Sequence, residues 1–117
     1  MVVYGFTGWR ARNLADKAVA NAESGHWHLA MVQVMSAGNL RPKDTSVKRA
    51  AAVVETLARR PDAAAKWEAL PARVALSAED LRLKAVAMTA SGSEEQYRAA
   101  LAELEAAGLT AVAAEMR

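Results

Sequence analysis

Residues 77–108 read SAEDLRLKAVAMTASGSEEQYRAALAELEAAG, and this stretch decides the fold class. It contains two capping boxes, in which a serine and an acidic or amide residue three positions later satisfy backbone N–H groups at a helix start. Ser77 with Asp80 forms the first box, and Ser93 with Gln96 forms the second. Strong helix formers, mainly alanine and leucine, follow each box. The stretch therefore predicts two successive helices joined by the short turn SGS.

The same signals extend over the whole chain, in which about a quarter of the residues are alanine. Gly25, Gly38 and Gly108 are placed to end helices, and Pro61 stops another. Because the predicted loops are short, the chain is expected to fold as an all-α, compact bundle of about five to seven short helices. The expected helices cover residues 9–24 (capped by Thr7 or Gly8), 27–37, 47–59 (capped by Asp44, Thr45 or Ser46), a short segment from Pro61 or Asp62 to Leu70, 78–90, 94–107, and a last turn from Thr110.

The N-terminal residues are predicted to differ from the rest. MVVYGF alternates as a strand does, but no other segment offers a partner strand. Residues 1–8 are therefore expected to form an extended arm that packs on the bundle or on a neighbouring subunit. The chain of 117 residues is otherwise expected to form a single domain over residues 1–117, since this length suits one hydrophobic core.

The segment WHLAMVQVMSA, residues 27–37, is apolar nearly all round. Such a pattern is typical of a buried helix, so this segment is expected to be the central helix of the bundle. A strand is the competing interpretation, but the length and the Ala, Met and Leu content favour a helix. Trp27 and Trp67 are expected inside the core, and Trp9 is expected to be partly exposed.

The composition of the chain bears on its cellular location and on the kinds of covalent or metal site that it can form. The chain has no cysteine, so disulfides and thiolate metal sites are excluded. Its start has neither a basic n-region nor a long apolar h-region, and no apolar stretch approaches the ~18 residues that span a membrane. We expect a cytoplasmic protein without a membrane partner.

The two histidines, His26 and His28, flank Trp27 in the sequence GHWHL. On a helix they would point about 200° apart and could not chelate one ion, although an extended segment would bring them to one face. No carboxylate pattern completes a ligand shell, and no nucleophile elbow, phosphate loop or dinucleotide turn is present. We therefore expect no metal, no cofactor and no enzymatic activity. The two histidines are expected on different sides of the start of the second helix, one capping or hydrogen-bonding at the turn and one at the edge of the core.

Charge is divided unevenly along the chain. Residues 1–60 contain nine Lys/Arg and four Asp/Glu, whereas residues 61–117 contain six and nine, which gives +5 and −3. A basic half suggests an anionic partner, and clustered lysine and arginine bind a phosphate backbone without reading its sequence. The predicted nucleic-acid-binding residues lie on the first and third helices and on the loop between residues 39 and 46: Arg10, Asn13, Lys17, Arg41, Lys43, Lys48, Arg49, Arg59 and Arg60.

A cysteine-free helical bundle of this size, basic on one side, resembles the small subunits of CRISPR effector complexes. The resemblance covers the whole chain in length, helix content and charge layout, and it includes no motif that assigns a residue. It implies a noncatalytic subunit of an antiviral ribonucleoprotein, present in several copies. Basic faces would contact a single strand or a guide–target duplex, RNA or DNA, and other faces would contact protein subunits.

Two hypotheses about function follow from the sequence. The first is a noncatalytic helical subunit of a nucleoprotein assembly that contacts nucleic-acid backbone through its basic N-terminal half and neighbouring subunits through other faces. The alternative is a protein-interaction module, such as an immunity, anti-defence or adaptor protein, whose basic face binds an acidic protein.

Overall fold

The computed structural model describes residues 2–71 and 74–116, and α-helices joined by turns and loops are the only regular secondary structure in these ranges. The prediction of an all-α fold built from short helices is confirmed. The helices are α1 (Val2–Glu23), α2 (Trp27–Leu40), α3 (Thr45–Leu57), α4 (Ala63–Glu68), α5 (Ala78–Ser91), α6 (Glu94–Ala106) and α7 (Thr110–Met116).

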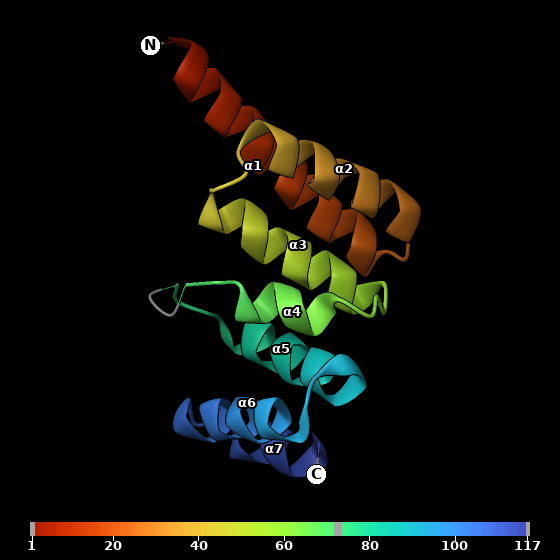
Figure 1. Ribbon diagram of the computed structural model, residues 1–117, viewed down its shortest axis with the longest axis vertical. Coiled ribbons are helices and arrows are strands. Elements are labelled where there is room, and N and C mark those ends of the chain that lie inside the picture. The colour runs from red at the N-terminus through yellow and green to blue at the C-terminus, as the bar shows by residue number, and fades with distance from the viewer. Residues whose placement is uncertain (1, 72–73, 117) are drawn as a thin grey trace.

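The helices are stacked in chain order along the longest axis of the molecule, which measures 47 Å against 28 and 21 Å for the other two (Figure 1). The pair α1 and α2 forms one end, and α6 with α7 forms the other. Between them, α3 packs on α1 and α2 on one side and on α4 and α5 on the other. The stack is built without a repeat in the sequence.

Two clusters of buried side chains hold the stack together. In the first, four alanines of α1, at spacings of three and four residues, let this helix approach α2 and α3 closely. The second surrounds Trp67 and joins α3 to the helices that follow it. Helix α3 contributes to both clusters, since Val54 belongs to the first and Val53 to the second.

The predicted helix boundaries hold where capping residues set them. Both capping boxes are present, at Ser77 with Asp80 and at Ser93 with Gln96. Helices α1 and α6 end with Gly25 and Gly108 in the left-handed conformation, at φ of 85° and 82°. Arg59 takes the same conformation after α3, with a φ of 57°, although its side chain makes this costly.

Three predicted boundaries are wrong. The expected extended arm is helical, because α1 begins at Val2 rather than after a cap at Thr7 or Gly8; Met1 lies outside the described residues. Helix α2 passes through Gly38 and ends at Leu40, since glycine weakens a helix without terminating it. Helix α3 covers Thr45–Leu57 instead of residues 47–59, because the side chain of Asp44 accepts hydrogen bonds from the N–H groups of Ser46 and Val47 and caps the helix earlier.

The prediction that the helix over residues 27–37 is central and buried is also wrong. The segment is helical, as expected, but it lies in the end layer of the stack, where only α1 and α3 pack on it. Its outer face therefore has no covering helix among the described residues. Trp27 is 50% exposed rather than inside, whereas Trp67 is buried and Trp9 is 63% exposed, as predicted for both.

Candidate functional site

The cations of the two halves of the chain differ in their pairing. Within residues 61–116, each described Lys or Arg forms an ion pair with a carboxylate of the chain: Lys66 with Glu55, Arg82 with Glu79, Lys84 with Glu103 and Arg98 with Glu94. Of the nine in residues 1–60, only Arg12 and Arg49 do so, with Asp44 and Asp80. The positive charge of the first half is thus largely uncompensated within the described part of the chain.

Three of the predicted contact residues share one side of α1. Arg10, Asn13 and Lys17 are three and four residues apart, so they lie opposite the buried alanines of the same helix. Arg10 and Lys17 are exposed, and Asn13 is half-buried. We call these three residues the α1 stripe.

Two more predicted residues, Arg41 and Lys43, lie on the loop between α2 and α3. This loop is held against α1, because the Nε atom of Arg12 lies 3.5 Å from Asp44 Oδ2. The guanidinium of Arg41 lies beside Gly8 of α1. Since Arg10 and Arg12 are two residues apart and point about 200° from each other, the α1 stripe and these loop cations occupy opposite flanks of α1.

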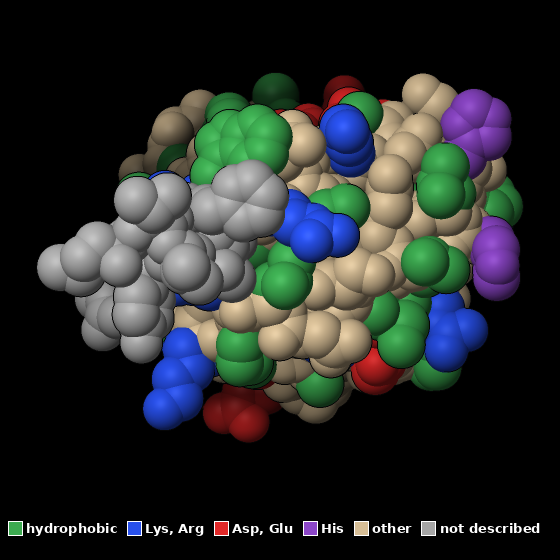
Figure 2. Space-filling view, turned by 90° about the horizontal axis from the view of Figure 1, so that it is seen from above, with side chains coloured by type: hydrophobic (Ala, Val, Ile, Leu, Met, Phe, Trp, Pro, Cys, Tyr) green, Lys and Arg blue, Asp and Glu red, His purple; other side chains and the backbone are tan. Residues whose placement is uncertain are grey.

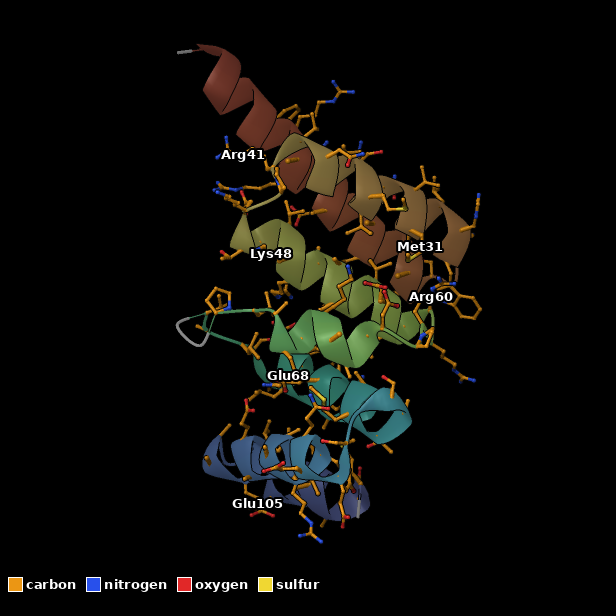
Figure 3. The ribbon with its side chains drawn as sticks, in the orientation of Figure 1. Met31, Arg41, Lys48, Arg60, Glu68 and Glu105 are labelled. Atoms are coloured by element: carbon orange, nitrogen blue, oxygen red, sulfur yellow. The ribbon has the colours of Figure 1, made fainter. Side chains whose placement is uncertain are left out.

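The structure does not bring the remaining predicted residues to α1. In Figure 3, Arg41 and Lys48 lie toward one end of α3 and Arg60 lies at its other end. Arg59 adjoins Arg60 in the turn after α3. Arg49 donates two hydrogen bonds to Asp80, of 2.6 and 2.9 Å, and is therefore engaged within the fold. The nine residues thus do not form one continuous surface, and Figure 2 shows cations at separate points around the α1–α2 end.

A groove of about 540 Å³ runs between α2, α3 and α4. Its apolar lining includes Met31, Val34 and Met35 from α2 and Val47 from α3. Lys48 and Arg60, both among the predicted contact residues, also line it. Near the start of α4 they are joined by three charged residues that were not predicted from the sequence: Glu55, Asp62 and Lys66. We call Glu55, Arg60, Asp62 and Lys66 the charged group of the groove.

Glu55 is the buried member of this charged group, with 4% of its surface exposed. Burial, together with a hydrogen bond to Asp62, raises its pKa from 4.5 to about 7, although the ammonium of Lys66, 3.7 Å away, opposes the shift. The same hydrogen bond lowers the pKa of Asp62. One signal in the sequence marks Glu55, since it follows Ala51, a partly buried residue of α3, by four residues.

Replacing Glu55 by glutamine is expected to remove a pH dependence of stability. A carboxyl group whose pKa is raised in the folded state stabilises the fold when protonated, and this contribution is lost as the pH rises from about 4.5 to about 7. The free energy of unfolding of the unmodified protein should therefore fall by about 2 kcal/mol between about pH 5 and pH 8 because of this group.

Urea unfolding at several pH values measures the effect. Glu55→Gln should flatten this part of the profile, whereas Glu68→Gln, a matched change at an exposed position of α4, should leave it unchanged. A Glu55→Gln profile that is parallel to that of the unmodified protein would contradict the assignment.

His26 lies at the turn before α2, whereas His28 lies in the first turn of α2, and both are exposed. His26 occupies the residue before α2, but its side chain makes no capping hydrogen bond. Within residues 2–71 and 74–116, no three His, Asp or Glu side chains are grouped so that they could hold a metal ion. None of the described helices is long and apolar enough to cross a membrane.

The sequence did not predict that the outer face of α2 would be exposed, since residues 27–37 were expected to be buried. Of the six large hydrophobic side chains exposed in the described part of the chain, five lie on α1 and α2. Figure 2 shows hydrophobic side chains spread over this end of the molecule, with both histidines at one rim. The five are Trp9, Trp27, Leu29, Val32 and Met35.

Comparison with known proteins yields no relative. No protein-family model matches the chain, and neither a curated protein nor a solved structure is significantly similar to it.

Proposed function

We propose that this protein is a noncatalytic helical subunit of a nucleoprotein assembly and that it contacts nucleic-acid backbone through the cations around α1. The proposal rests on one observation, which is that the lysines and arginines of the two halves differ in whether they form ion pairs. The four described cations of the second half each pair with a carboxylate of the same chain. Arg10, Lys17, Arg41 and Lys43, by contrast, form no ion pair within the described residues.

Unpaired surface cations are what a phosphate backbone requires. Each phosphate that a cation neutralises releases a condensed counterion, so binding gains free energy without recognising bases. A cation already held by a carboxylate contributes less, because its partner must first be displaced. Because the α1 stripe and the loop cations flank one helix, a strand that crosses α1 would meet both groups. The resemblance to CRISPR small subunits implies the same role, with other faces contacting protein subunits.

Neutralising the α1 stripe is expected to weaken binding to single-stranded RNA or DNA. The double variant Arg10→Gln with Lys17→Gln removes two phosphate contacts, which should reduce affinity about 10- to 30-fold at ~0.1 M salt. The slope of log K against log salt concentration should become shallower by ~1.4. Fluorescence anisotropy with a labelled homopolymer strand, over a series of salt concentrations, measures both quantities.

The matched control is Arg82→Gln with Arg98→Gln, which removes the same net charge from two exposed but internally paired positions. This control should change affinity by much less than the α1 variant. Equal loss in both variants would indicate a general charge effect and refute the α1 interface. Absence of salt-dependent binding by the unmodified protein, together with a partner retained in a nuclease-treated pull-down, would favour an acidic protein as the partner.

A further inference from the structure

Helix α2 carries no formal charge at all, since residues 27–40 contain no Asp, Glu, Lys or Arg. Its outward side presents His28, Val32, Met35 and Asn39, all of which are exposed. Their spacing of four, three and four residues is that of a heptad seam, the pattern by which two helices pack side by side. In this chain no described helix covers the seam.

The seam is symmetric about its own centre, which falls between positions 33 and 34. The two outer residues, His28 and Asn39, are polar and able to hydrogen-bond, and the two inner residues, Val32 and Met35, are apolar. A twofold axis through the centre would therefore place Val32 against Met35 of a second copy and His28 against Asn39 of that copy. Self-complementarity of this kind is what an isologous interface requires.

We propose that the outer face of α2 is a homodimer interface, in which α2 packs antiparallel on α2 of a second copy of this chain. The contact would bury an apolar centre and close each end with a histidine–asparagine hydrogen bond. Because the helix is uncharged, twofold pairing brings no like charges together along the seam. The second copy is thereby favoured over the phosphate backbone as the occupant of this face.

The exposed area is consistent with a modest interface. Val32 is 49% exposed and Met35 63%, and Trp27 and Leu29, at 50% and 49%, border them. Together these four side chains of α2 offer on the order of 450 Å² per copy, near the lower limit for a specific contact. We therefore expect a reversible dimer with a dissociation constant on the order of 10 μM rather than an obligate one.

Charge substitutions at the two inner positions test both the face and the register. Met35→Glu or Val32→Lys alone would place an unpaired charge against an apolar side chain, so each should weaken the dimer at least tenfold in sedimentation equilibrium. The double variant carrying both substitutions should restore the dimer, since the antiparallel register puts the introduced carboxylate of one copy against the introduced ammonium of the other. A parallel register would instead face like charges.

Val86→Glu provides the control, because Val86 is an exposed hydrophobic residue of α5, away from the seam. It should leave the dissociation constant unchanged, and circular dichroism should show equal helicity for all variants. A protein that remains monomeric at ~0.5 mM would overturn the proposal, given the expected affinity. A dimer insensitive to Met35→Glu, or a double variant that stays monomeric, would also overturn it. The seam contains none of the cations proposed to bind nucleic acid, so the two proposals succeed or fail separately.

Discussion

Replacing Trp67 by alanine is expected to lower the free energy of unfolding by about 4 kcal/mol. The indole ring is 2% exposed and occupies the centre of the second buried cluster, between α3, α4 and α5. Its Nε1–H donates a 2.8 Å hydrogen bond to Thr56 Oγ1, and the hydroxyl of Thr56 donates in turn to the carbonyl of Ala52 at 2.7 Å. The substitution therefore leaves a large cavity and removes one hydrogen bond between α4 and α3.

Urea denaturation followed by far-ultraviolet circular dichroism measures this loss independently of tryptophan fluorescence. Trp27→Ala is the matched control, since it deletes the same side chain from a position that is half exposed. That change should cost less than half as much, because less apolar surface returns to water and no enclosed cavity forms. Equal losses in the two variants would show that Trp27 is as buried as Trp67 and would contradict the exposed face of α2.

The second large effect is expected at the pair formed by Arg49 and Asp80. Asp80 is 3% exposed, yet its pKa lies below the usual 3.8. Burial alone would raise that pKa, but the hydrogen bonds and the charge of Arg49, together with Ser77, outweigh it. Arg49→Met would leave the buried carboxylate without its cation, and we expect a loss of about 2–3 kcal/mol at neutral pH.

The double variant Arg49→Met with Asp80→Asn should recover at least half of this loss, because an amide needs no counter-charge and still accepts at the capping box. The dependence of the free energy of unfolding on pH supplies a second test. The lowered pKa of Asp80 means that the pair stabilises the unmodified protein above about pH 4 and that this contribution is lost as the pH falls below that value. Arg49→Met should no longer show this loss on acidification. Additive effects in the double variant would mean that the two side chains do not act as a pair.

Local signals predicted most of the fold. The boxes at Ser77 and Ser93 set helix starts, and Gly25 and Gly108 set helix ends, because these signals act on the nearest backbone groups alone. What could not be predicted was which helix would be covered. The pattern of residues 27–37 indicates only that the segment is hydrophobic. Whether the segment is buried depends on whether another helix packs on its outer side.

The site was predicted in part. The excess of cations in the first half can be counted from the sequence, and the stripe of Arg10, Asn13 and Lys17 follows from helical spacing. The ion pair of Arg49 with Asp80 joins positions 31 apart, and no local pattern indicates it. The placement of Arg60 at the other end of α3 from Arg41, in contrast, follows from chain order, because the predicted helix over residues 47–59 lies between them.

Because α3 supplies side chains to both buried clusters, the change of charge near residue 60 does not separate two independent modules. The positive and the negative halves belong to one continuous stack of helices, so the molecule carries an electric dipole along its long axis. In the field of a polyanion such a body rotates before it makes contact and approaches with its α1–α2 end first. The orientation of the encounter is then set by the fold itself, at a distance where no side chain has yet touched the partner.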